Sequence, residues 1–183
     1  MKYNNVVTLG HEIIDKYLTN DSICVDMTLG NGNDTLYLLS KAKFVYSFDI
    51  QEMGIINSKK LLNDNNIDDN KYKLILDDHQ NVKKYILNDK IDIGIFNLGY
   101  LPKSDKTIKT NYISTINALN NLLELMNKNS MIILTVYKHE EGLLEYQEIN
   151  NLLNTFDMKK YNIIKFEHIN KPISPSIILI EIN

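Results

Sequence analysis

DMTLGNGNDT, residues 26–35, places one acid before two glycines and a second acid after them, between two apolar segments. The upstream segment SICVDM (22–27) is typical of a strand, and residues 34–42 are typical of a helix. A strand that ends in glycines and leads into a helix brings backbone amides close to a ligand. Gly30 and Gly32 can adopt positive φ angles, which lets a ligand approach the main chain. The stretch therefore predicts a ligand-binding loop at the carboxyl end of a strand.

Strands and helices alternate along the rest of the chain. Runs rich in Ile, Val and Leu predict strands, and apolar residues at helical spacing predict helices. We expect strands at residues 22–27, 44–48, 72–76, 91–97, 130–137, 161–167 and 176–182, and helices at residues 8–19, 34–42, 52–64, 81–88, 110–126 and 142–156. Strands that are apolar on both faces and alternate with helices indicate a mostly parallel sheet covered on both sides.

The last two predicted strands have no helix between them. Only HINKPISP, residues 168–175, separates them, and this short connection favours an antiparallel hairpin at the edge of the sheet. Seven strands with an antiparallel last strand are the arrangement of the Rossmann-like class I methyltransferases. We therefore predict an α/β fold of this class, with a seven-stranded mostly parallel sheet, helices on both faces, and a single domain over residues 1–183.

Composition limits the partners and the chemistry. The net charge is −3, so no overall basic character points to nucleic acid, although a local patch can suffice. All 20 basic residues are lysine, so phosphate contacts must use lysine or backbone amides. Cys24 is the only cysteine, which excludes an internal disulfide and a thiolate-rich metal site. The N-terminal sequence has no signal-peptide pattern, and no apolar run reaches about 18 residues. We expect a cytoplasmic protein without a membrane segment.

An acid also follows the second predicted strand. Asp49 comes 17 residues after Gly32, and a carboxylate at this position of such folds accepts the hydroxyls of a ribose. The dinucleotide fingerprint needs Gly or Ala where Thr35 stands. An acid before the glycines suits S-adenosylmethionine (SAM) better, because its methionyl ammonium needs an acceptor that Asp26 or Asp34 can provide. The alternative is that Asp34 or Thr35 caps the following helix.

The usual methyltransferase loop reads acid-x-G-x-G-x-G, and Thr28 stands here at the first glycine. The candidate cofactor residues lie in this loop and after the next three predicted strands: Asp26, Thr28, Gly30, Asn31, Gly32, Asn33, Asp34, Thr35, Asp49, Gln51, Asp78, His79 and Asn97.

The fourth predicted strand ends in FNLGYLP, residues 96–102. This stretch resembles the N-P-P-Y loop of amino-group methyltransferases, in which an amine must direct its lone pair at the methyl carbon. Asn97 can supply an amide oxygen that accepts an amine hydrogen, Leu98 a backbone carbonyl, and Tyr100 a ring for stacking on a base. The alternative is a plain turn after the strand.

Five motifs together make the chain similar to the putative rRNA methylase family, now understood as the tRNA 5-aminomethyl-2-thiouridine methyltransferases of Gram-positive bacteria and plants. They are DMTLGNGNDTLYL, FDIQ, DDHQN, FNLGYLPKSDK and VYKHEEG, in this order over the whole chain. The resemblance implies SAM-dependent methylation of the aminomethyl group on the wobble uridine of tRNA, and contact with the anticodon region.

Several other residues are candidates with an equally good structural explanation. His79 or Asp78 can contact an adenine ring or lie in a solvated turn, and His139 can contact the substrate or act as a base. Asp105 can take a proton or cap a helix. Lys103, Lys106, Lys109 and Lys138 can contact phosphates, and Tyr112 and Tyr137 can stack on bases. His11 and His168 match no pattern and are expected to be incidental, and the histidines form no metal-ligand pattern, so we predict no metal.

Three functions compete. A SAM-dependent N-methyltransferase of tRNA fits best, and methylation of an rRNA base or a small amine is the alternative within the same class. An NAD-dependent oxidoreductase is disfavoured by Thr35, by the acid before the glycines and by the terminal hairpin. A nucleotide-binding module without catalysis is disfavoured by the presence of Asn97, Tyr100 and Asp49. The sequence leaves room for a homodimer.

Overall fold

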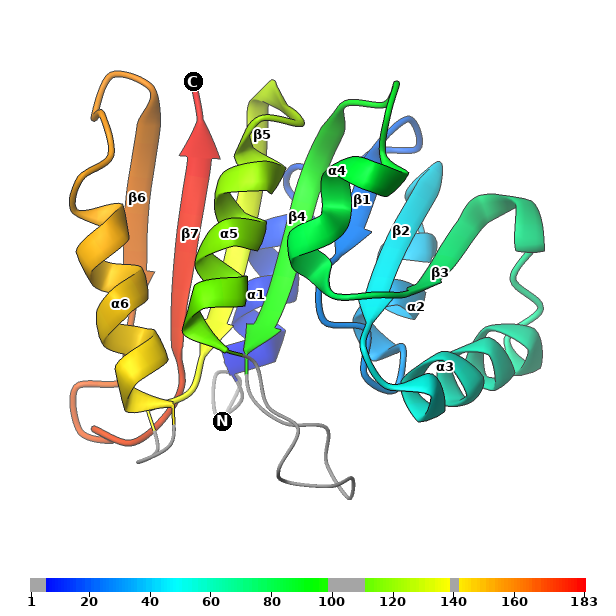
Figure 1. The fold of residues 1–183 in the computed structure, drawn as a ribbon, viewed down its shortest axis with the longest axis horizontal. Helices are drawn as coiled ribbons and strands as arrows, with labels where there is room; N and C mark the ends of the chain where they lie inside the picture. Colours follow the sequence, from blue (N-terminus) through cyan, green and yellow to red (C-terminus); the bar gives the residue numbers. More distant parts are fainter. Residues whose placement is uncertain (1–5, 99–110, 139–141) are drawn as a thin grey trace.

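The computed structural model describes residues 6–98, 111–138 and 142–183 (Figure 1). Its strands are β1 (Ile23–Asp26), β2 (Phe44–Asp49), β3 (Tyr72–Leu76), β4 (Ile91–Leu98), β5 (Met126–Val136), β6 (Tyr161–Phe166) and β7 (Ser176–Ile182). Its α-helices are α1 (Val6–Ile14), α2 (Asn33–Leu39), α3 (Glu52–Asp64), α4 (Val82–Tyr85), α5 (Tyr112–Leu123) and α6 (Leu143–Leu153), with short 3-10 turns at Asp69–Lys71 and His79–Asn81. None of the helices within these ranges is long and apolar enough to cross a membrane.

The strands form one seven-stranded sheet in the order β3-β2-β1-β4-β5-β7-β6. The first five strands of the chain pair in parallel, and β7 lies antiparallel between β5 and β6. The predicted α/β fold with an antiparallel last strand is therefore confirmed. β1 and β4 are neighbours, and the connections run in opposite directions from them, to β2 and β3 on one side and to β5 on the other. Sheets of this kind bind ligands in the crevice at the carboxyl ends of the two strands where the direction changes.

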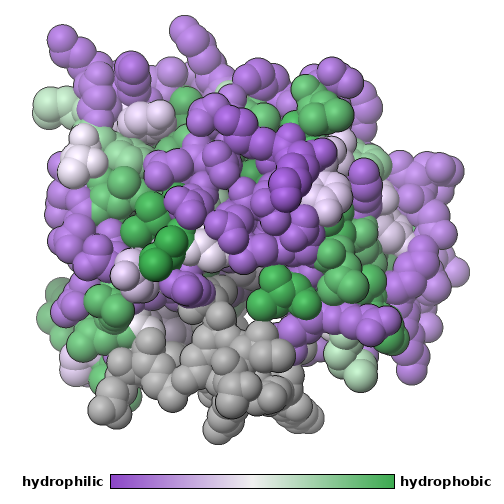
Figure 2. All heavy atoms as spheres, viewed as in Figure 1, coloured by the Kyte–Doolittle hydropathy of each residue, from purple (hydrophilic) through white to green (hydrophobic). Residues whose placement is uncertain are grey.

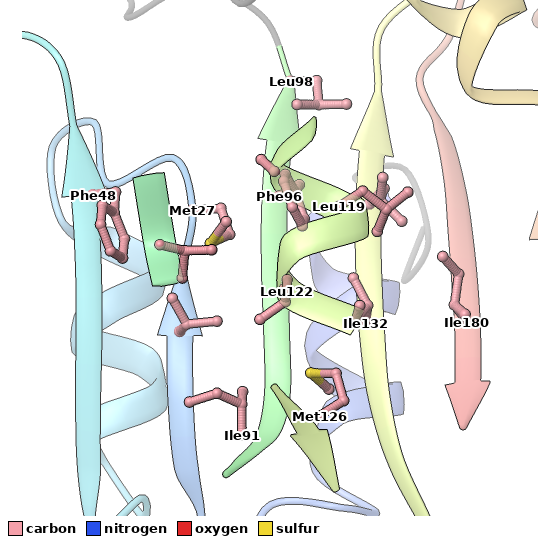
Figure 3. Packing of buried hydrophobic residues seen from close by; sticks show 14 of the residues in the cluster. Met27, Phe48, Ile91, Phe96, Leu98, Leu119, Leu122, Met126, Ile132 and Ile180 are labelled. Atoms are coloured by element: carbon pink, nitrogen blue, oxygen red, sulfur yellow. The ribbon is translucent and has the colours of Figure 1, made fainter. Parts of the chain in front are cut away.

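Helices cover both faces of the sheet (Figure 1). The core cluster that includes Phe48, Phe96 and Leu119 lies between the sheet and the helices α4, α5 and α6, and Figure 3 shows its packing. A second cluster, with Ile14, Leu38 and others, lies between the sheet and α1, α2 and α3. The described surface on the α4–α6 side is mostly hydrophilic (Figure 2).

The alternation of side chains on β4 decides where Asn97 points. Phe96 and Leu98 belong to the cluster under α4–α6, while Ile93 and Ile95 belong to the cluster under α1–α3. Side chains on a strand alternate between the two faces, so Asn97 shares the face of Ile93 and Ile95. Asn97 is therefore directed toward α1 and α2.

The helix predicted at residues 110–126 is shorter than expected. It ends at Leu123, and Met126 begins β5, where it pairs with Ile91. The buried face of α5 is Thr115, Ala118, Leu119 and Leu122, whereas Ile113 is 53% exposed. The apolar pattern continued from the helix into the strand without a break, so the spacing alone placed the end of the helix too late.

Candidate active site

The loop between β1 and α2 has the backbone that its glycines allow. Gly30 and Gly32 have φ angles of 53° and 81°, in the left-handed region that favours glycine. A Cβ on Gly32 would lie 2.7 Å from Oγ of Ser58 on α3. Gly32 is also the N-cap of α2, so the alternative in which Asp34 or Thr35 caps this helix is wrong. The loop thus needs glycine both for its conformation and for the close approach of α3.

Asp26 holds the loop from inside. Its side chain is fully buried, and its carboxylate accepts hydrogen bonds from the backbone N–H of Thr28 at 3.0 Å and from Oγ1 of Thr35 at 2.8 Å. Thr35 is also 2.8 Å from Oγ of Ser47. Burial, followed by the nearby charge of Asp34, raises the pKa of Asp26 to about 7. This placement favours Asp34 over Asp26 as the acceptor for a ligand ammonium.

Asp49 lies at the end of β2, where the ribose acceptor is predicted. Its Oδ2 accepts the N–H of Gly30 at 2.9 Å and its Oδ1 accepts the N–H of Gln51 at 2.8 Å. Burial raises the pKa of Asp49, and the backbone hydrogen bonds oppose that shift. A carboxylate has about four acceptor positions, so this one can also accept ligand hydroxyls. Asn31 is exposed and accepts a hydrogen bond from Asn57 at 3.3 Å.

Asn97 is tied to the loop by two hydrogen bonds. Its backbone N–H donates to Oγ1 of Thr28 at 2.6 Å, and its side-chain Nδ2 donates to Oδ2 of Asp34. Its side-chain oxygen Oδ1 is buried and has no hydrogen-bond partner among the described residues. A buried polar atom without a partner is costly, and here it is the atom that the sequence predicts to accept an amine hydrogen.

His11 joins the same group of residues, contrary to the expectation that it is incidental. Its Nε2 lies 2.8 Å from Oδ1 of Asp34, and its ring stacks on Tyr37 with centroids 3.7 Å apart. The sequence held no signal for this contact, because His11 and Asp34 are 23 residues apart and are brought together by the packing of α1 on the sheet.

Asp78 and His79 follow β3, but their side chains are mostly engaged within the protein. Asp78 accepts hydrogen bonds from the N–H of Gln80 and from Oγ of Ser114. His79 is 8% exposed, and its Nδ1 lies 2.9 Å from the carbonyl oxygen of Met27. Its Nε2 is buried, has no hydrogen-bond partner within the described ranges and lies 4.0 Å from Oδ1 of Asp78. The alternative of a solvated turn is therefore wrong for His79.

The structure places three of the predicted substrate-binding residues. Leu98 is buried at the end of β4, and Tyr137 is 36% exposed after β5. Lys138 lies 3.3 Å from the carboxylate of Glu167 and 5.6 Å from the ring centroid of Tyr146, so its charge is already paired. Six other candidates lie outside the described residues: Tyr100, Lys103, Asp105, Lys106, Lys109 and His139. No cluster of three or more His, Cys, Asp or Glu side chains in the described parts is arranged to hold a metal ion.

The chain is similar to proteins of one family. The family model described as "Putative rRNA methylase" matches residues 45–181. The crystal structure of a "putative rRNA-methylase" from Clostridium thermocellum superposes with a TM-score of 0.95 at 34% identity, over 100% of both chains. SMU.1697c, a "putative methyltransferase" from Streptococcus mutans in complex with SAH (S-adenosylhomocysteine), gives a TM-score of 0.91 at 32% identity, over 98% of this chain and 99% of the other.

A curated relative carries a more specific name. The chloroplastic tRNA (mnm(5)s(2)U34)-methyltransferase of Arabidopsis thaliana is 26% identical over 182 residues, which cover 93% of this chain. The chain spans 66% of the length of that relative.

Proposed function

Because the chain belongs to the "Putative rRNA methylase" family of SAM-dependent class I methyltransferases, we propose that it methylates the nitrogen of an aminomethyl group on the wobble uridine of tRNA. The named activity of the Arabidopsis relative supports this substrate. The observation that carries the proposal is the buried Oδ1 of Asn97 at the carboxyl end of β4, which has no hydrogen-bond partner among the described residues. An attacking amine has hydrogens to donate, and an amide oxygen accepts them.

The described residues fit SAM. Gly30 and Gly32 give the loop its two left-handed turns, Asp49 can accept ribose hydroxyls, and Asp34 presents a carboxylate in the first turn of α2. When bound, SAM supplies a methyl group on a positively charged sulfur. Family membership and this loop argue against the NAD-dependent oxidoreductase.

Asn97 would act by orienting the amine. An alkylamine resembles lysine, whose ordinary pKa is about 10.4, so about one molecule in a few thousand is neutral at pH 7. Only the neutral form has a lone pair, which forms the nitrogen–carbon bond while the carbon–sulfur bond breaks and S-adenosylhomocysteine leaves. Accepting one amine hydrogen at Oδ1 directs that lone pair away from Asn97 and toward the methyl carbon. One proton is released to solvent for each methyl transferred.

Product analysis tests the proposal. The protein is incubated with SAM and with tRNA whose wobble uridine carries the unmethylated aminomethyl group. The tRNA is then digested, and the masses of its nucleosides are measured by mass spectrometry. We expect this nucleoside to gain one methyl group and every other nucleoside to stay unchanged. An rRNA fragment and a simple alkylamine serve as competing acceptors, and methylation of either one in preference to the tRNA would overturn the substrate assignment.

A further inference from the structure

Three side chains from three elements form a continuous chain of hydrogen bonds. His11 of α1 contacts Oδ1 of Asp34 at 2.8 Å, and Oδ2 of the same carboxylate accepts from Nδ2 of Asn97. The side chains of His11 and Asp34 are 28% and 13% exposed, so the chain runs from near the surface to the buried end of β4.

The chemistry of Asp34 fixes the orientation of both neighbours. A carboxylate only accepts hydrogen bonds, so Nε2 of His11 must carry a hydrogen and Asn97 must turn its NH₂ group toward Asp34. The amide oxygen of Asn97 then faces the other way, where it is buried without a partner in the described structure. Without Asp34 in place, the broad two-fold torsion of an asparagine amide would let nitrogen and oxygen exchange positions.

His11 is itself held firmly. Its ring lies parallel to that of Tyr37, with an interplanar angle of 7°. The hydroxyl of Tyr37 lies 2.8 Å from the carbonyl oxygen of His11 and 2.6 Å from Oδ1 of Asp15, and its single hydrogen is shared between these two acceptors. Tyr37 and Asp34 both belong to α2, so the histidine is fixed against the helix that follows the glycine loop.

We propose that His11 is a positioning residue for methyl transfer: through Asp34 it holds the amide oxygen of Asn97 toward the amine. The inference rests on the proposed function of Asn97. Loss of the His11 hydrogen bond frees one oxygen of Asp34, the carboxylate can rotate, and the amide of Asn97 can turn its NH₂ group toward the substrate. An NH₂ group there would repel the hydrogens of the amine instead of accepting one.

Two variants of His11 and one control test this role. His11→Ala removes the donor, and His11→Gln keeps an N–H at a similar distance from the backbone. His168→Gln changes a histidine in the connection between β6 and β7. We expect His11→Ala to lower kcat, measured at saturating SAM, about ten- to a hundredfold, with KM for tRNA nearly unchanged and with losses of SAM affinity and melting temperature too small to account for the lower rate. His11→Gln should recover most of the rate, and His168→Gln should match the unaltered protein.

Two outcomes would overturn the proposal: an unchanged kcat in His11→Ala, or a loss of SAM affinity or folding that accounts for the lost rate. A spectroscopic measurement separates this inference from the choice of substrate. The side-chain amide signals of Asn97, assigned with Asn97→Ala, should shift in His11→Ala and return toward their position in His11→Gln. If those signals move but tRNA is not methylated, the proposed substrate fails and the positioning role stands. If tRNA is methylated but neither the signals nor kcat respond, the positioning role fails alone.

Discussion

Thr28 and Asn97 lie 69 positions apart in the chain and are joined by a 2.6 Å hydrogen bond from the backbone N–H of Asn97 to Oγ1 of Thr28. The bond connects the loop after β1 to the end of β4. It therefore holds the predicted cofactor loop and the predicted catalytic residue Asn97 in a fixed position relative to each other. Thr28 occupies the position of the first glycine in the usual methyltransferase loop. A glycine there has no hydroxyl, and the departure from the usual pattern therefore has a structural role.

Replacing Thr28 with valine should weaken both folding and turnover. Valine keeps the shape of threonine but leaves the N–H of Asn97 without the acceptor that the structure gives it, which costs about 1–3 kcal/mol. Urea denaturation measures the stability, and methyl release measures the rate. Thr28→Ser is the matched control, because it keeps the hydroxyl. Equal stability of the valine and serine variants would show that this hydrogen bond does not stabilise the folded protein.

Replacing Asn97 with alanine should lower the rate of methyl transfer about a hundredfold or more, the scale of losing a group that orients the reacting atoms. SAM affinity should stay nearly intact, because the amide acts on the amine. Single-turnover rates and calorimetric titration separate the two effects. Asn65→Ala, an exposed asparagine after α3, is the control. A collapse of SAM binding with a normal rate per bound SAM would place Asn97 in the cofactor site instead.

The fold was predictable because its signals are local. Each strand is a short apolar run, and the missing helix before β7 already indicated the antiparallel hairpin. In the candidate site, motifs in the sequence singled out Asp49 and Asn97, which lie at the carboxyl ends of β2 and β4; their roles stay predictions. His11 carries no such mark, since its partner Asp34 is reached only through the packing of α1. The burial of Asp26 could not be predicted either. The sequence does not distinguish an acid at the end of a strand that faces a ligand from one that faces the interior.

Asp26 should make the protein less stable as the pH rises. Its pKa is raised from 3.8 to about 7 in the folded state, so between these values the folded state binds more protons than the unfolded state. Stability attributable to this group is therefore present at low pH and is lost as the pH rises toward 7, by up to about 1.4 kcal/mol per pH unit.

Urea denaturation at pH 5, 6 and 7 measures this effect. Asp26→Asn cannot ionise, so its stability relative to the unaltered protein should increase with pH. Asp69→Asn is the contrasting control, because hydrogen bonding to Lys59 lowers the pKa of that exposed carboxyl, and its removal should not reproduce the trend. A constant difference between Asp26→Asn and the unaltered protein at all three pH values would contradict the raised pKa.

Gly54, in the first turn of α3, was not singled out by the sequence, yet it limits the position of Asp49, the predicted ribose acceptor. A Cβ on Gly54 would lie 2.5 Å from Oδ2 of Asp49 and 3.1 Å from the carbonyl oxygen of Gly30. Contacts below 3.0 Å force one of the groups to move. Oδ2 is also the atom that accepts the N–H of Gly30, so a displaced carboxylate would release the glycine loop as well.

Gly54→Ala should therefore weaken SAM binding by about tenfold or more, the scale of losing one charged hydrogen bond of 1.5–3 kcal/mol. Gly10→Ala is a matched control, because Gly10 also lies in a helix but its added Cβ would meet Ile133 at 3.5 Å, an ordinary contact. Alanine is the better helix former at both positions, so a general effect on helices would act equally on the two variants. Calorimetric titration with SAM and thermal unfolding of both variants separate binding from folding. Equal SAM affinities in the two variants would show that Asp49 keeps its position without Gly54, and a loss of affinity confined to Gly54→Ala would place the carboxylate of Asp49 in the cofactor site.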